Sequence, residues 1–272
     1  MTVAGIRSPL LCSGDSQANE AAVFVHGNPG WSGDWVDLLQ GVGSFGRGLA
    51  MDMPGFGRAD KPRDFDYSVT GLSTHLGRLL DVARVERAHL VLHDFGGPWG
   101  LAWAARNVAR VASVTLINIG ILPGYRWHAM ARLWRTPVVG EMVMAATTPA
   151  VLKLAMRCAN PRSFPAGYVQ EMCDNFDSGT RRAVLELYRS TGDISAMSSR
   201  LAAALAHHRL PALVVWGARD PYVPVRFAEV QRRFFAVDRV VRLEGSGHWP
   251  MIDNPGAVGS AVIPFLRERA AR

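Results

Sequence analysis

Short, unbroken apolar runs recur along the chain, and most of them end at Gly, Asp or His. Runs of this length without polar interruption suit strands that are buried on both faces, which is typical of a parallel sheet. We predict strands in the runs at 21–27, 47–55, 88–94, 111–120, 210–220 and 238–248.

Segments with apolar residues near helical spacing separate these runs. One covers 68–85 and begins with Ser68, a good helix N-cap. Another follows Asp94 directly, and a third closes the chain from residue 254. Strand alternating with helix predicts an α/β fold with a mostly parallel, doubly wound sheet.

The rhythm breaks between residues 121 and 208, where the sequence is rich in Met, Ala and Arg, is helical in pattern and has no strong strand run. A plain pair of crossover helices would be shorter than this segment. We therefore expect a helical cap (lid) at 121–208, inserted into a core made of 1–120 and 209–272.

Composition narrows the function classes. The chain has 272 residues, of which 49% are hydrophobic, and a net charge of +7 from scattered arginines without a dense basic run. We therefore expect neither a nucleic-acid partner nor a membrane partner, since no stretch of about 18 uncharged apolar residues occurs either. Three cysteines without ligand-like spacing and an N-terminus without a leader pattern favour a cytoplasmic protein. The oligomeric state is left open, a homodimer included.

Three polar residues stand at the carboxyl ends of predicted strands, where open α/β sheets bind ligands. Asp94 precedes Gly96 and Gly97, which suit a sharp strand–turn–helix elbow. A carboxylate there needs no base to attack an sp³ carbon and form an ester. His248 is a candidate base for hydrolysing that ester, and Asp220 a candidate partner for the imidazole.

The turn at 25–30, VHGNPG, supplies a further element. Backbone N–H groups of Asn28 and of Phe95 are candidates for an oxyanion hole. His26 is interpreted as a structural turn histidine, and His207–His208 as part of a linker. We expect no metal and no organic cofactor.

Five segments, HGNPG, DMPGFGRADKP, LHDFGG, WGARDPYVP and GSGHWPMIDNP, together resemble landmark segments of the α/β-hydrolase superfamily. The resemblance runs from about residue 21 to the end. With Asp at the elbow, the chain resembles the branch of this superfamily that holds the epoxide hydrolases and haloalkane dehalogenases. That likeness implies that Asp94 is the nucleophile, His248 the base and Asp220 its partner.

The two activities of that branch leave different marks. Haloalkane dehalogenases usually have Asn in HGNP and Trp directly after the nucleophile, and both hold the departing halide. Asn28 fits this pattern, whereas Phe95 has no N–H donor on its ring. No motif places Trp31, Trp99 or Trp127 at the halide-binding position. Some dehalogenases place the acid after the strand before the lid, but this chain has Asn118 there.

Epoxide hydrolases usually use a pair of lid tyrosines to bind the epoxide oxygen. Tyr188, followed by Arg189, resembles the second of them, and Tyr125 is preferred over Tyr168 as the first. We therefore expect an epoxide hydrolase that acts on a small apolar substrate. A haloalkane dehalogenase is the first alternative, and a catalytically silent ligand-binding protein of this fold is the second.

Overall fold

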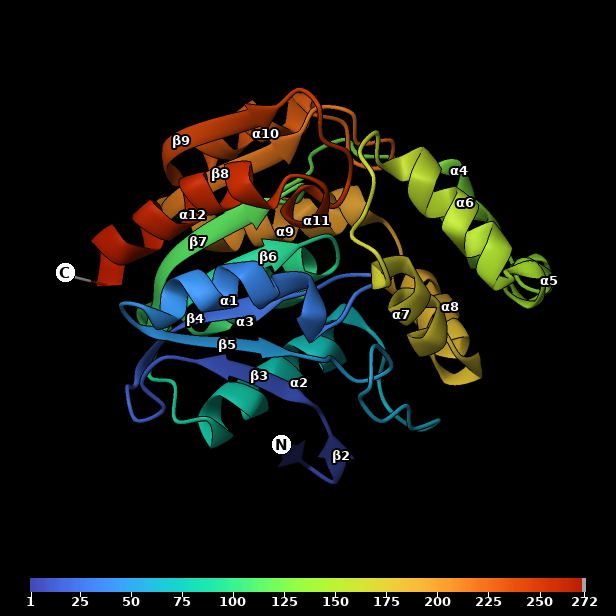
Figure 1. The fold of residues 1–272 in the computed structure, drawn as a ribbon, viewed down its shortest axis with the longest axis horizontal. Coiled ribbons are helices and arrows are strands. Elements are labelled where there is room, and N and C mark those ends of the chain that lie inside the picture. Colours follow the sequence, from blue (N-terminus) through green and yellow to red (C-terminus); the bar gives the residue numbers. More distant parts are fainter. Residues whose placement is uncertain (271–272) are drawn as a thin grey trace.

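The computed structural model of the chain describes residues 1–270, which contain a seven-stranded sheet with the order β3-β5-β4-β6-β7-β8-β9 (Figure 1). The neighbouring strands from β5 to β9 run parallel, and β3 pairs antiparallel with β5. The predicted mostly parallel sheet is thereby confirmed. The strands of the sheet are β3 Leu10–Ser13, β4 Glu20–Val25, β5 Arg47–Met51, β6 Arg87–His93, β7 Val111–Ile117, β8 Pro211–Gly217 and β9 Ala236–Leu243.

The central strands form the core of the molecule. Val23, Leu90, Val114 and Val214, one from each of four neighbouring strands, are fully buried. Helices cover both faces, so neither side of these strands needs polar residues, and the unbroken apolar runs are explained. The small N-terminal hairpin of β1 (Thr2–Val3) and β2 (Ile6–Arg7) was not predicted, nor was the edge strand β3.

Two layers of helices enclose the sheet (Figure 1). On one face α1 packs against α12, and on the other α3 packs against both α2 and α9. Ser68 caps α2 as expected, because its hydroxyl accepts the N–H of Gly71 at 3.2 Å. These helices and two short ones are α1 Val36–Gly43, α2 Val69–Val82, α3 Gly96–Arg106, α9 Ile194–Leu205, α10 Arg226–Val230, α11 Pro250–Asp253 and α12 Pro255–Ala270.

Between β7 and β8, the chain forms five helices that stand together beside the carboxyl ends of the strands (Figure 1). The sixth helix of this segment, α9, instead packs against α3 of the core. We therefore propose that the cap ends near residue 193 rather than at 208. The cap helices are α4 Ala129–Arg135, α5 Val139–Ala146, α6 Pro149–Ala159, α7 Tyr168–Asn175 and α8 Ser178–Thr191.

The cap helices α7 and α8 are fixed to the core by polar contacts. Tyr168 of α7 donates its hydroxyl to Asp34 Oδ1 at 2.9 Å and stacks on Trp31. Lys61 forms an ion pair of 2.8 Å with Asp177, the N-cap of α8. An exposed ion pair such as Lys61–Asp177 contributes little to stability by itself. Asp34, by contrast, is buried, and its burial raises the pKa of its carboxyl well above the usual value.

Helices α5 and α6 are the most apolar pair of the cap. Within residues 1–270, no single helix has both the length and the apolar composition needed to cross a membrane. Taken together, α5 and α6 would meet that test, but they are bent by 96° at the break between them.

Candidate active site

Asp94 lies on a sharp elbow between β6 and α3. Its φ of 47° is in the left-handed region, which Asp tolerates better than most residues. The elbow presses Gly96 against the end of β4, where a Cβ atom would lie 2.1 Å from the carbonyl oxygen of Val25. The chain can therefore make this turn only with glycine at position 96, and the turn directs the Asp94 side chain above the sheet edge.

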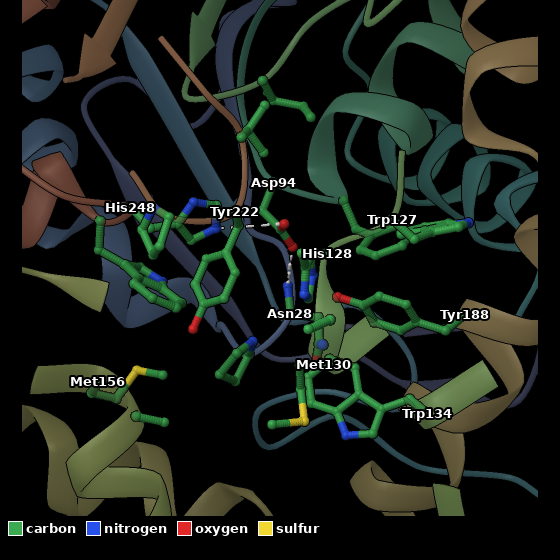
Figure 2. A pocket seen from close by; sticks show the side chains of 18 of the residues that line it. Asn28, Asp94, Trp127, His128, Met130, Trp134, Met156, Tyr188, Tyr222 and His248 are labelled. Atoms are coloured by element: carbon green, nitrogen blue, oxygen red, sulfur yellow. Dashed lines mark hydrogen bonds and ion pairs between the residues drawn. The ribbon is translucent and has the colours of Figure 1, made fainter. Parts of the chain in front are cut away.

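The structure brings Asp94, His248 and Asp220 together from the loops after β6, β9 and β8. His248 Nε2 lies 3.5 Å from Asp94 Oδ2, and His248 Nδ1 lies 2.7 Å from Asp220 Oδ2. The imidazole thus stands between two carboxylates, and all three side chains are largely or fully buried. Figure 2 shows His248 and Asp94 facing each other in the pocket.

Asp220 is held rigidly by its neighbours. Its Oδ1 accepts the backbone N–H groups of Tyr222 and Val223 at 2.7 and 3.0 Å. Its Oδ2 accepts the side-chain amide of Asn118 at 2.6 Å in addition to the imidazole of His248. Asn118 therefore serves as a donor that orients Asp220.

The charges of the site are set by this arrangement. Burial opposes the ionisation of Asp94, but His248 and the N–H of Asn28 lower the pKa of its carboxyl to about 2. Burial likewise opposes a charge on His248, but Asp220 and Asp94 raise the pKa of the imidazole to about 10. At neutral pH the site therefore holds an ionised Asp94 against a charged His248.

Asn28 contributes both its backbone and its side chain. Its N–H donates to Asp94 Oδ1 at 2.7 Å, which fixes one carboxylate oxygen. Its buried side-chain atoms, Nδ2 and Oδ1, make no hydrogen bond of regular geometry, although the amide lies close enough to the Tyr188 hydroxyl to lower the pKa of that group. Buried amides normally have partners, so this one is available to a bound molecule. Gly27 lets the turn come this close, since a Cβ there would lie 2.3 Å from Asp94 Oδ1.

A cavity of about 450 Å³ opens above Asp94, between the core and the cap. Figure 2 shows Trp127, Trp134, Met130 and Met156 around it. Most of its wall is apolar, which suits a small apolar molecule. The polar groups in the wall include Asn28, Asp94, His128, Tyr188, Tyr222 and His248.

The two lid tyrosines of the sequence prediction are placed differently. Tyr188, on α8, packs against the ring of Phe95 with centroids 4.9 Å apart, and its hydroxyl points into the cavity toward Asn28 (Figure 2). Burial, followed by the charge of Asp94, raises the pKa of Tyr188 well above its usual value, so it remains a proton-bearing donor. Tyr125 also lines the cavity, but its hydroxyl donates to the carbonyl oxygen of Tyr222 at 3.1 Å.

His128 is a cavity residue that the sequence reasoning missed. It caps α4, and its Nδ1 accepts the N–H of Ala131 at 3.2 Å. Burial lowers the pKa of His128 to about 4, so the ring is neutral and must carry its proton on Nε2. The one signal for His128 in the sequence was its position directly before a helical pattern, where a cap residue stands. Because Ser, Thr, Asp and Asn are the usual caps, this signal is weak for a histidine.

Metal ligation has no support in the part of the chain that the structure describes. No group of three or more His, Cys, Asp and Glu side chains there is arranged to hold a metal ion. The site is built from two carboxylates, an imidazole and hydrogen-bond donors.

Comparison with known proteins agrees with this geometry. Residues 22–255 match the family model described as the alpha/beta hydrolase fold. The chain belongs to the α/β-hydrolase family. Within it, the relatives and structural neighbours place this hydrolase in the branch of haloalkane dehalogenases and epoxide hydrolases, as predicted.

Three similar proteins illustrate this placement of the hydrolase. A cis-3-alkyl-4-alkyloxetan-2-one decarboxylase from Xanthomonas campestris is 28% identical, and the match covers 96% of this chain and 93% of that protein. A haloalkane dehalogenase from Mycobacterium marinum is 31% identical, and the match covers 73% of this chain and 68% of that protein. The crystal structure of a haloalkane dehalogenase from Bradyrhizobium elkani has a TM-score of 0.88 and 26% identity, covering 100% of this chain and 97% of that one.

Proposed function

We propose that this hydrolase opens epoxides through a covalent ester on Asp94 and releases a vicinal diol. The observation that carries the proposal is the ionised Asp94, whose Oδ1 is bound by the N–H of Asn28 while its Oδ2 faces His248 under the cavity. An ionised carboxylate attacks an sp³ carbon directly and needs no base to activate it.

In the first step, Asp94 forms a bond to one epoxide carbon, and the carbon–oxygen bond of the ring breaks. The electron pair goes to the epoxide oxygen, which takes a proton from a donor in the cavity. The hydroxyl of Tyr188 and the Nε2–H of His128 are the donors that suit this oxygen.

In the second step, His248 takes a proton from water, and the water oxygen attacks the carbonyl carbon of the ester. The N–H of Asn28 is already positioned at Asp94 Oδ1 to stabilise the tetrahedral oxyanion. The bond between that carbon and the alkoxy oxygen then breaks, and the diol leaves with the proton. Because the ester is neutral, Asp94 no longer helps Asp220 to raise the pKa of His248, and His248 gives its resting proton to the donor that was depleted in the first step before it acts as a base. The second proton of the water stays on the new Asp94 carboxyl group and then moves to His248, which restores the resting charges of the site.

Phe95 favours an oxygen leaving group over a halide. Its ring stands directly after Asp94 and against Tyr188, where an indole N–H would be needed to hold a halide. Losing one such donor weakens transition-state stabilisation by roughly 2.7–4 kcal/mol in comparable sites. Tyr188 instead presents a hydroxyl, which stabilises and protonates a developing alkoxide.

Two other electrophiles fit the same ester chemistry. The dehalogenase relatives and the free amide of Asn28 favour a haloalkane. The decarboxylase relative is named for an oxetan-2-one, which is a strained four-membered cyclic ester. Asp94 could likewise open its carbon–oxygen bond. Both remain candidates, and the three substrate classes give different products.

Single-turnover reactions of His248→Gln distinguish the three classes. Excess enzyme is mixed separately with a terminal alkyl epoxide, a 1-bromoalkane and a cis-3,4-dialkyl-oxetan-2-one of equal chain length. The mass of the protein is then measured by mass spectrometry. We expect the epoxide to add its full mass at Asp94, with diol formed only by the wild-type enzyme.

Asp94→Asn serves as the matched control, since it removes the nucleophile and should give no adduct. Halide release or lactone consumption without any reaction of the epoxide would refute the epoxide assignment. If none of the three gives an adduct on Asp94, the ester mechanism itself is wrong.

A further inference from the structure

The outer surface of the cap carries exposed apolar side chains. Among the described residues, seven of the eleven exposed large hydrophobic side chains lie between positions 130 and 154. Val138, Met142 and Leu154 are the most exposed, at 69, 66 and 61%. They belong to the loop before α5, to α5 and to α6, which form the outermost edge of the molecule in Figure 1. We call α4, α5 and α6 together the cap tip.

The cap tip is also strongly basic. Between residues 126 and 162, six of the seven charged side chains are Arg or Lys, and the one acid, Glu141, is paired with Arg189 at 2.7 Å. None of the ion pairs among residues 1–270 involves Arg132, Lys153 or Arg157, and all three are exposed. Cationic groups beside exposed apolar ones are typical of surfaces that lie on anionic lipid.

The cavity opens within this surface. Met130 of α4 and Val151 of α6 both line the cavity above Asp94, and both are exposed, at 40 and 49%. Helices α7 and α8, by contrast, are fixed to the core by Tyr168 and Asp177. The apolar and basic side of the cap is therefore also the side from which a molecule reaches the catalytic residues.

We propose that the cap tip docks on an anionic lipid surface, so that apolar substrates pass from the bilayer into the cavity. Met142, Leu154 and their neighbours enter the headgroup region, while Arg132, Lys153 and Arg157 contact lipid phosphates. The substrate route rests on the proposed function, whereas the docking does not.

Charge argues against a second copy of this chain as the occupant. In a two-fold dimer the same patch faces itself, which would bring the unpaired basic side chains of both copies together. An anionic bilayer offers the opposite charge. This surface differs from the expectation of no membrane partner. That expectation rested on the lack of a stretch of about 18 uncharged apolar residues, whereas the cap tip combines side chains from three short helices.

Co-sedimentation of the purified full chain with lipid vesicles tests the docking without any substrate. Vesicles of phosphatidylcholine alone are compared with vesicles that contain one quarter phosphatidylglycerol. We expect binding to the anionic vesicles only, weakening as salt is raised from 50 to 500 mM. Lys153→Gln and Arg157→Gln should each weaken it about fivefold, and the double variant Met142→Ser/Leu154→Ser by at least tenfold.

Val82→Ser is the matched control, because Val82 is 55% exposed at the C-terminal end of α2, a helix of the core. It should leave vesicle binding unchanged, and thermal unfolding verifies that each variant is folded. Absence of binding to anionic vesicles, or equal effects of the cap-tip and control variants, would overturn the proposal. So would a dimer in sedimentation velocity that Met142→Ser/Leu154→Ser dissociates, since a second copy would then cover the patch.

Activity on a water-soluble epoxide separates the two proposals. If docking fails while this activity persists, the cap tip is not a lipid-binding surface, and the proposed function stands. If docking is observed while no epoxide reacts, the lipid proposal stands, and the function must be revised.

Discussion

Replacing Asp94 with Asn should lower the pKa of His248. The imidazole is charged because two carboxylates flank it, and Asp94 is the one that lies 3.5 Å from Nε2. Two unit charges at this distance attract each other by about 4.7 kcal/mol at an effective dielectric constant of 20, which is an upper bound of about 3.5 pKa units. We expect the pKa of His248 to fall from about 10 by roughly 1–3 units.

The assay is a titration of ¹⁵N-histidine-labelled protein by NMR between pH 5 and 11, in the wild type and in Asp94→Asn. His248→Gln identifies the signal among the eight histidines. Mass spectrometry before and after the titration verifies that the Asp94→Asn variant has kept its new amide, since deamidation would regenerate the carboxylate. An unchanged pKa in Asp94→Asn would refute the view that the ester intermediate frees His248 to act as a base.

The same titration has a consequence for stability. The folded-state pKa of His248, about 10, lies above the ordinary value of 6.5. Its charge therefore stabilises the fold fully below pH 6.5, and this stabilisation is lost as the pH rises through 10. In Asp94→Asn the loss should again begin near pH 6.5 but be complete at a lower pH than in the wild type, which urea unfolding between pH 7 and 10 would measure.

Four further variants test the remaining assignments. Tyr188→Phe should lower kcat/KM for epoxides by roughly 10²–10³, whereas Tyr125→Phe should lower it less than tenfold, because that hydroxyl is already bound to a backbone carbonyl; equal losses in initial-rate assays would contradict these roles. Phe95→Trp should increase halide release from bromoalkanes while the larger ring costs about 1–3 kcal/mol of stability, and halide release that does not change would count against the assigned role. The raised pKa of Asp34 means that the contribution of this carboxyl group to stability falls as the pH rises from about 4; the difference in stability between the wild type and Asp34→Asn should therefore change between pH 5 and 8 in urea unfolding, to the disadvantage of the wild type at pH 8, and a constant difference would contradict it.

The grouping of the candidate catalytic residues at one edge of the sheet could be predicted from sequence, because parallel strands all end on the same side. Asp94 and Asp220 each follow a continuous apolar run, and His248 follows the mixed apolar and charged strand β9, so their proximity follows from the sheet topology. The edge strand β3 was missed because its apolar run is only three residues long, and two of its four residues are exposed.

Side-chain direction within the cap could not be predicted in this way. Tyr125 and Tyr188 both line the cavity, but the loop before α4 turns the Tyr125 hydroxyl toward a backbone carbonyl. The tautomer of His128 depends on one N–H at the start of a helix, a detail that no spacing rule contains. The boundary of the cap escaped for a related reason, since α9 has a helical pattern like its neighbours and only tertiary packing assigns it to the core.

The packing of α9 bears on how this protein could evolve. Parallel neighbours such as β7 and β8 need one crossover helix, and α9 supplies it on the same face as α3. Helices α4 to α8 are then an excursion that the sheet does not require, entered and left above the strand ends. A lineage could shorten, lengthen or exchange this excursion and so acquire new substrates, while Asp94, Asp220 and His248 kept their places on an unaltered scaffold.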